Sequence, residues 1–159
     1  MKKMKIELFP VNAMRKVAAE FLAVFKKRVQ SGKDANDKEF PPYTKEYAEL
    51  KAKGMTGESG RRLPRYGGIS ITSKNVATPD FTLRGITLKS TRITNVEKNA
   101  FEFGWDGEPA DIVAGNAGRD RDIMSDITEN EKVWVTNRLG NIVQDQINKL
   151  KDVNVTIRI

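Results

Sequence analysis

The chain contains neither cysteine nor histidine among its 159 residues. Without cysteine there are no disulfides and no thiolate sites, which is compatible with a reducing cytoplasm. Without histidine the chain lacks the commonest general base and the commonest metal ligand of proteins. No apolar run approaches the roughly 20 residues that cross a bilayer. Because Glu7 and Pro10 also interrupt any hydrophobic segment behind the basic start, we expect neither a membrane span nor a signal peptide.

The composition suits a single domain, residues 1–159, with a lean core. Hydrophobic residues make up 38% and charged residues 31% of the chain. Residues 1–79 hold 17 basic and 8 acidic side chains, a net +9, whereas residues 80–159 hold 11 and 13, a net −2. This asymmetry is compatible with nucleic-acid contact, with copies packing head to tail, or with an unevenly charged solvated surface.

Within the segment from Leu83 to Trp105, residues Arg92–Trp105 predict a β-hairpin. Its second half alternates large aromatic residues with polar or small ones, in the order Phe101, Glu102, Phe103, Gly104 and Trp105. Such period-two alternation is typical of a strand with one buried face. A polar turn over Asn95–Asn99 then predicts that Arg92–Thr94 runs back antiparallel.

Two amphipathic helices are predicted, Asn12 to Gln30 and Thr128 to Lys151. The first has an apolar stripe at helical spacing, formed by Met14, Val17, Ala18, Phe21, Phe25 and Val29. The second opens with a capping box, Thr128 to Glu131. Its stripe comprises Val135, Leu139, Ile142, Val143, Ile147 and Leu150. Gly140 inside it costs about 1 kcal/mol relative to alanine, which suggests close approach by another backbone.

Shorter elements are predicted around these helices. Thr44 caps a short helix reaching about Lys53, and Glu108-Pro109 opens a helical turn over Ala110–Ala114. Strands are predicted at Lys5–Phe9, at Ile69–Thr72 and at Val153–Ile159, the last of which alternates without a fault. The whole is an α+β domain: two amphipathic helices packed on one antiparallel sheet, made of the hairpin with edge strands from the two chain ends.

Residues 31–79 predict a long extended loop region with little burial. Nearly 50 residues of this kind are unusual inside a compact domain. We therefore expect the region to be partly mobile or to become ordered against another protein.

The candidate catalytic and metal-binding motifs of the sequence each lack residues that the chemistry requires. The calcium-like loop Asp34–Glu39 has Lys38 and Glu39 where oxygen and glycine are needed. The glycine-rich run Gly54–Gly60 lacks the Gly-Lys-Ser/Thr ending that grips phosphate. Asp120, Asp122 and Asp126 stand beside arginines and predict a loop ion-pair cluster rather than proton donors. We expect no enzyme, no cofactor and no metal.

A basic loop offers the best nucleic-acid candidate. Arg61, Arg62 and Arg65 could contact phosphate, and Tyr66 could stack on a base. An ordinary flexible loop or a protein-contacting loop explains the same residues.

Three motifs in a fixed order resemble the virion morphogenesis and tail-completion (head–tail neck) proteins of tailed phages. After the first helix, residues 32–51 read Gly-Lys-Asp-x-Asn-x-x-x-Phe-Pro-Pro-Tyr-Thr-x-x-Tyr-Ala-x-x-Lys. Leu83-Arg84-Gly85 follows the basic loop, and residues 121–129 read Arg-Asp-Ile-Met-Ser-Asp-Ile-Thr-Glu before the last helix. The chain departs from the family at Asn36-Asp37-Lys38, where a glycine turn is usual, at Asp122, which replaces a proline, and in lacking the His-Gln-Phe-Gly that precedes the second loop.

The resemblance implies a structural virion protein, made in the host cytoplasm, that forms a six-fold or twelve-fold homo-oligomeric ring at the portal-to-tail junction. It implies contacts with portal or adaptor and tail proteins, and genomic DNA that passes through the lumen without sequence readout. The subunit or partner contacts expected are Phe40, Tyr43, Arg61, Arg62, Arg65, Tyr66, Arg119, Arg121, Val155 and Ile157. The alternatives are a basic DNA-binding accessory protein, which would use Arg61, Arg62 and Arg65, and a small hydrolase built on the three aspartates.

Overall fold

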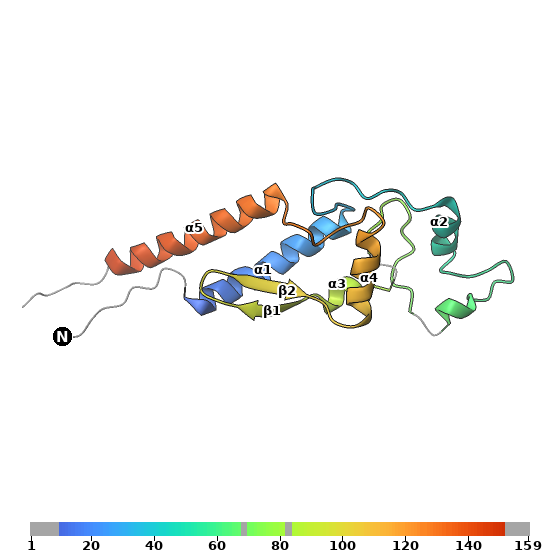
Figure 1. Cartoon of the computed structure of the whole chain (residues 1–159), viewed down its shortest axis with the longest axis horizontal. Coiled ribbons are helices and arrows are strands. Elements are labelled where there is room, and N and C mark those ends of the chain that lie inside the picture. The colour runs from blue at the N-terminus through green and yellow to red at the C-terminus, as the bar shows by residue number, and fades with distance from the viewer. Residues whose placement is uncertain (1–9, 68–69, 82–83, 152–159) are drawn as a thin grey trace, which may run out of the picture.

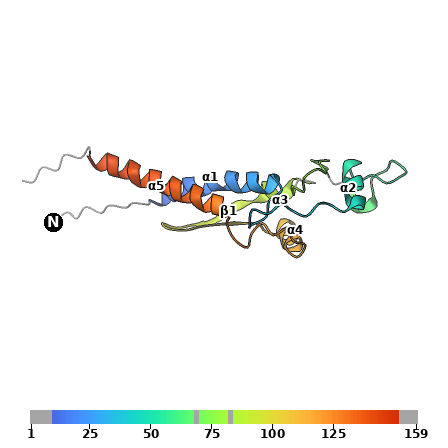
Figure 2. The ribbon, with the colours of Figure 1, turned by 90° about the horizontal axis from the view of Figure 1, so that it is seen from above.

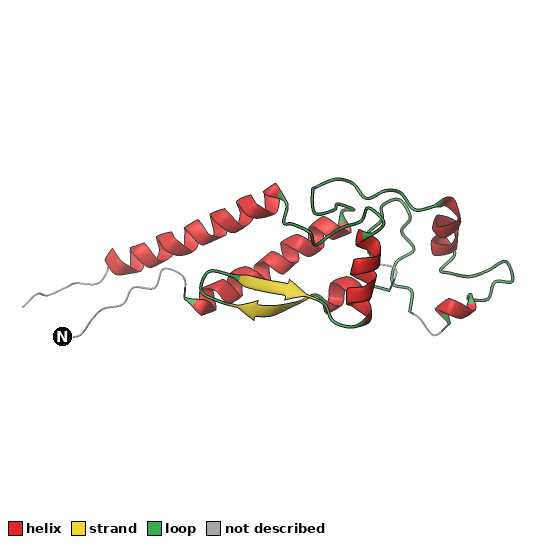
Figure 3. Ribbon diagram, viewed as in Figure 1, coloured by secondary structure: helices red, strands yellow, loops and turns green. Residues whose placement is uncertain are grey.

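The structure is a computed structural model that describes residues 10–67, 70–81 and 84–151. Helices dominate it around one short hairpin (Figures 1 and 3), so the α+β class predicted from the sequence is confirmed. The elements in chain order are α1 (Val11–Gln30), α2 (Lys45–Ala52), the 3-10 helix η1 (Pro64–Tyr66), α3 (Ile86–Ser90), β1 (Arg92–Val96), β2 (Phe101–Gly104), α4 (Glu108–Ala117) and α5 (Glu129–Lys151).

The predicted hairpin forms and packs on α1. Strands β1 and β2 pair antiparallel, with Arg92 opposite Gly104 and a bulge between Ile93 and Asn95. β1 continues to Val96, so the turn is shorter than predicted. The aromatic face of β2 meets two buried phenylalanines of α1, with ring centroids 5.4 Å apart for Phe21–Phe101, 5.6 Å for Phe21–Phe103 and 4.9 Å for Phe25–Phe103. These rings form the centre of the core.

The closing helix corrects one detail of the predicted packing. α5 lies chiefly along α1, rather than beside α1 on the sheet (Figures 1 and 2). Trp134 reaches the core, with its ring 6.2 Å from that of Phe21. The capping box is confirmed: the Thr128 hydroxyl accepts from the Glu131 amide at 3.2 Å, and Glu131 accepts from the Thr128 amide at 2.9 Å.

The predicted edge strands remain untested. Lys5–Phe9 and Val153–Ile159 lie outside the described residues, within which the sheet has two strands. The predicted strand at Ile69–Thr72 is wrong over its described part, residues 70–72, which have no regular structure. Helix α4 runs three residues beyond the predicted end at Ala114.

Residues 31–79 are better anchored than their composition predicts. The α2 helix forms as expected, and the Thr44 hydroxyl accepts from the Tyr47 amide at 3.3 Å. Phe40 is buried in the main core, and Met55 is fully buried. A backbone hydrogen bond of 3.0 Å, from the Leu63 amide to the Met55 carbonyl, brings the two ends of the intervening loop together. The expectation of little burial is therefore wrong at these anchors, although most residues between them are exposed.

One buried arginine joins four parts of the chain. Arg28 of α1 donates through Nε to Glu131 Oε1 at 2.8 Å. Its terminal nitrogens donate to the carbonyl oxygens of Lys33, Asp34 and Ile123 at 3.2, 2.6 and 3.2 Å. Arg28 and Glu131 are 8% and 2% exposed. The planar guanidinium suits this task because its donors point in fixed directions.

Replacing Arg28 with alanine is expected to lower the free energy of unfolding by about 3–5 kcal/mol, because Glu131 would remain buried without its charged partner. The measurement is the urea unfolding midpoint, with Lys27→Ala as the matched control, because Lys27 is an exposed cation on the same helix. The control is expected to change stability by less than about 0.5 kcal/mol. Equal losses in both variants would contradict the role assigned to Arg28.

Candidate functional site

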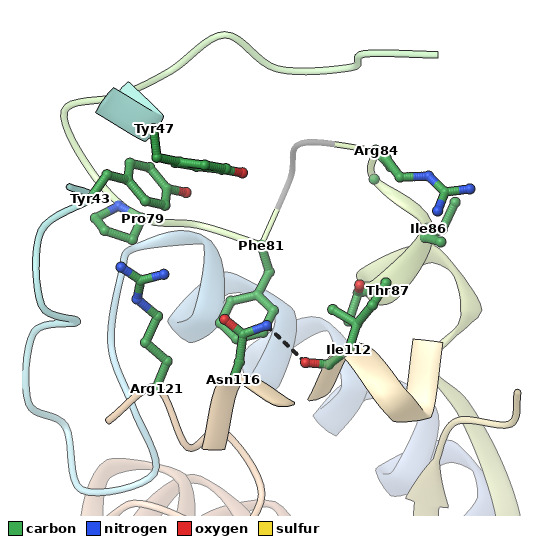
Figure 4. A pocket seen from close by; sticks show the side chains of 11 residues that line it. Tyr43, Tyr47, Pro79, Phe81, Arg84, Ile86, Thr87, Ile112, Asn116 and Arg121 are labelled. Carbon is green, nitrogen blue, oxygen red and sulfur yellow. Dashed lines mark hydrogen bonds between the residues drawn. The ribbon is translucent and has the colours of Figure 1, made fainter. Parts of the chain in front are cut away.

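An aromatic-lined pocket lies between α2, the segment that leads into α3, and α4 (Figure 4). It has a volume of about 230 Å³ and mostly apolar walls with polar groups at the edge. Its lining residues are Tyr43, Tyr47, Pro79, Phe81, Arg84, Gly85, Ile86, Thr87, Ile112, Asn116 and Arg121. Three of these are aromatic, so the pocket can accept an apolar or planar group.

Two tyrosines form the wall on the α2 side. The rings of Tyr43 and Tyr47 lie 4.9 Å apart, and Arg121 stacks on Tyr43 with its guanidinium carbon 5.1 Å from the ring centroid. Burial and the neighbouring Tyr43 raise the pKa of the Tyr47 hydroxyl to about 12. Tyr47 is therefore neutral at physiological pH and offers the pocket a hydrogen-bond donor.

A buried ion pair holds this wall in place. Lys51 of α2 is fully buried, and its Nζ lies 3.2 Å from Asp80 Oδ1 and 3.0 Å from the Tyr43 hydroxyl. The Asp80 amide also donates to that hydroxyl, at 3.4 Å. The pair ties α2 to the chain entering the pocket at Phe81, whose ring packs on Phe40 at 5.5 Å. Sequence reasoning missed Lys51 and Asp80, although a lysine one turn after the inward-facing Tyr47 was a usable signal.

The predicted ion-pair cluster around residues 119–126 does not form. Arg121 donates instead to the carbonyl oxygens of Pro41 and Pro42, at 3.1 and 3.3 Å. Asp122 accepts from the amides of Met124 and Ser125, at 2.8 and 3.0 Å. The physical reason is local: the short aspartate side chain can accept hydrogen bonds from backbone amides of the turn that directly follows it. Arg119 and Asp120 are exposed, and Asp126 pairs with Lys132 at 3.6 Å.

Asp122 also has an altered acidity. Burial disfavours its charged form, but the hydrogen bonds from Met124 and Ser125 and the charge of Arg28 outweigh this, so the pKa of Asp122 lies below its ordinary value of 3.8. A lowered carboxylate pKa contributes stability above the unfolded-state pKa, and this contribution is lost as the pH falls through the folded-state pKa.

The second candidate site is a basic arm, residues 53–67, at the end of the molecule beyond α2 (Figure 1). It holds four cations, Lys53, Arg61, Arg62 and Arg65, and one acid, Glu58. The arm doubles back on itself: the Gly57 amide donates to the Arg61 carbonyl at 2.9 Å, and Thr56 and Arg62 form a β-bridge.

The four cations of the basic arm are exposed. Arg65 lies over the ring of Tyr66, with its guanidinium carbon 4.8 Å from the centroid. The exposed positive groups and the stacked tyrosine suit contact with a polyanion.

The other expected contact residues fall into three groups. Tyr43 and Arg121 meet at the pocket. Arg119 is exposed and is not among the residues that line the pocket. Phe40 is 5% exposed and belongs to the core, so the expectation that it contacts a partner is corrected. Val155 and Ile157 lie outside the described residues.

Over residues 10–67, 70–81 and 84–151, no group of three or more acidic side chains is arranged to hold a metal ion. Within the same ranges, none of the helices has the length and apolar character of a bilayer-crossing segment. At the calcium-like loop, Asp34 instead caps its own turn by accepting from the amides of Asn36 and Lys38, at 2.8 and 2.9 Å.

Comparison of the chain with protein-family models, with curated proteins and with solved structures finds no match in any of the three. The likeness to phage neck proteins therefore rests on the sequence motifs quoted above.

Replacing Lys51 with alanine is expected to loosen α2 and the basic arm, because Asp80 would keep a buried charge without its cation. Hydrogen exchange of the α2 amides should then accelerate at least tenfold, while exchange in α1 stays slow. Lys53→Ala is the matched control, because Lys53 is an exposed lysine just after α2. Unchanged exchange in Lys51→Ala would show that the ion pair does not hold the wall.

Replacing Asp122 with asparagine is expected to destabilise the protein at neutral pH and to matter less in acid. Wild type carries the favourable charged carboxylate above about pH 4 and loses that advantage at lower pH. The urea midpoints of the two proteins should therefore converge as the pH falls below about 4 and through the lowered pKa of Asp122. A difference that stays constant over this range would mean that the charge of Asp122 contributes nothing.

Proposed function

We propose that the chain is a structural protein of a tailed-phage virion, a subunit of the ring that joins the portal or adaptor to the tail. The order of sequence motifs between residues 32 and 129 is the first support. In this role the protein works by assembly: its segments at residues 33–79, which include α2, and at residues 115–122, which begin at the end of α4, contact adjacent subunits or tiers. DNA passes through the ring without base readout.

The observation that carries the proposal is the anchored basic arm. Its root is fixed by the buried Met55 and by the Lys51–Asp80 pair, while its tip exposes Arg61, Arg62 and Arg65. A rigid root with a cationic tip can hold charge at a defined place along a DNA path. Arginine contacts to phosphate carry no sequence information, which is what a DNA conduit requires.

The arrangement of the elements also favours a subunit with neighbours at both ends. The basic arm lies at one end of the molecule, and α5 extends past the start of α1 at the other (Figures 1 and 2). The charge differs between the chain halves, +9 for residues 1–79 and −2 for residues 80–159. Unlike ends that meet in successive copies give heterologous contacts, which close into a ring when the rotation allows.

The pocket supplies a place for such a neighbour. Tyr43, Tyr47 and Phe81 offer apolar surface, and Arg121 stands at the edge. A loop of an adjoining subunit that inserts an apolar side chain would find both contact area and hydrogen-bond partners there.

A second candidate function is DNA binding by the isolated chain. The exposed arginines of the basic arm and the Arg65–Tyr66 stack favour it. Its signature is an affinity that falls steeply as salt rises, with a slope that reports the number of phosphate contacts. A ring subunit need not bind free DNA as a monomer.

The decisive test of the proposed function is the composition of purified particles of the phage that encodes the chain. Mass spectrometry should find the chain in a fixed low copy number per virion, six or twelve. Particles from a deletion mutant should lack tails or lose their DNA. Infectious wild-type particles that lack the chain would refute the proposal.

The basic arm can be tested in the same system. The triple variant Arg61→Gln, Arg62→Gln, Arg65→Gln is expected to lower the yield of infectious particles at least tenfold on complementation. The charge-matched control Arg15→Gln, Lys16→Gln, Lys27→Gln changes exposed cations of α1 and should restore wild-type yield. If the triple variant also abolishes salt-dependent DNA binding by the purified chain, and particles lack the protein, the accessory role is favoured instead.

A further inference from the structure

The outward face of α5 carries little charge. Between Val133 and Asn148, Asp145 is the single exposed charged side chain of the helix, and the one arginine in that range, Arg138, turns inward to Glu20 at 2.6 Å. In contrast, α1 exposes Arg15, Lys16 and Lys27. In a chain with 31% charged residues, a solvated helix face over four turns would ordinarily hold lysine and glutamate.

Two apolar side chains are exposed on this face at matched positions. Val133 is 57% and Ile147 is 38% exposed. Each lies seven residues from Gly140, and seven residues are nearly two helical turns, so all three lie along one line of α5. The side of α5 turned away from α1 is not covered by another described element (Figures 1 and 2).

Gly140 has no role within the described fold. A side-chain carbon placed on it would meet nothing within 4 Å, so no backbone among the described residues approaches it. The close approach suggested by its place in the helix is therefore absent inside the described chain. Glycine in a helix interior weakens the helix relative to alanine, and a second helix that packs at this point would use the missing side chain.

We propose that α5 pairs with α5 of a second copy of this chain, antiparallel and about a two-fold axis at Gly140. Val133 and Ile147 are equally far from Gly140. The two-fold axis therefore places Val133 of one copy against Ile147 of the second copy, and Ile147 of the first against Val133 of the second. The surrounding amides, among them Asn137, Asn141 and Gln144, both donate and accept hydrogen bonds, so the face is self-complementary.

The charge pattern favours a second copy over other occupants. Nucleic acid or an acidic partner would be recognised by cations, and this face presents none between Val133 and Asn148. Copies of a chain with net charge +7 repel one another, and they repel least where their surfaces are neutral. The pairing joins two copies outside the proposed ring and does not depend on that ring, because a two-fold contact is isologous whereas the ring contacts are heterologous.

The chain suits a disulfide test because it has no cysteine. Under oxidation, an equimolar mixture of Val133→Cys and Ile147→Cys should yield a disulfide-linked dimer, because residue 133 faces residue 147 of the other copy. Each variant alone should yield at least tenfold less, because like residues would lie about 20 Å apart along the helix, beyond the reach of a disulfide. Ala23→Cys, exposed on α1, is the control for random collision.

A second variant tests the close approach at the two-fold axis. Gly140→Leu favours the helix but fills the contact, so it should reduce cross-linking of the mixture at least tenfold while circular dichroism keeps its helical signal. Efficient cross-linking of Val133→Cys alone and of Ile147→Cys alone would overturn the antiparallel arrangement. Yields no higher than those of Ala23→Cys in every combination, or full cross-linking in the Gly140→Leu background, would overturn the pairing. Particle analysis tests the virion role separately, so either proposal can fail alone.

Discussion

A single guanidinium group constrains how this chain closes on itself. Arg28 stands at the end of α1 and is surrounded by a glutamate from α5 and by carbonyl groups from residues 33, 34 and 123. Burying a charge is unfavourable unless it is paired and its hydrogen bonds are met. Misplacing any of these segments would leave a buried charge or donor unsatisfied. Arg28 and its partners, which we call the hub, therefore specify one arrangement of the loop at residues 33–34, the capping box and the two long helices.

Glu131 shows how local and long-range order are coupled at this hub. One carboxylate oxygen accepts from the Thr128 amide and completes the capping box, while the other accepts from Arg28. The start of α5 is thus set both by its own sequence and by its position against α1. Aromatic packing between α1 and the hairpin then fills the space beside the hub.

The surfaces at the two ends of the molecule differ in charge and polarity. At the α2 end, the buried Lys51–Asp80 pair supports exposed arginines and an aromatic pocket, so contacts there are cationic and apolar. At the α5 end, the outward face carries little charge and is rich in amides. A cationic arm suits a DNA path or an acidic neighbour, whereas a weakly charged, self-complementary face suits a like copy. The two proposals therefore concern separate surfaces of one subunit.

The sequence by itself determined the local elements. Period-two aromatics predicted β2, apolar spacing predicted α1 and α5, and the Thr128–Glu131 box marked where α5 begins, because these signals depend on neighbours within a few residues. Only the tertiary structure decided which polar groups meet. Arg28 occupies a position on the apolar stripe of α1, three residues after Phe25, and Lys51 follows Tyr47 on α2, yet their partners lie 103 and 29 residues away. The predicted ion-pair cluster around residue 120 was wrong for the same reason. Arg121 donates to carbonyl oxygens 80 and 79 residues away rather than pairing with the adjacent aspartates. Pairings across such separations are selected by the shape of the folded core, which local spacing does not encode.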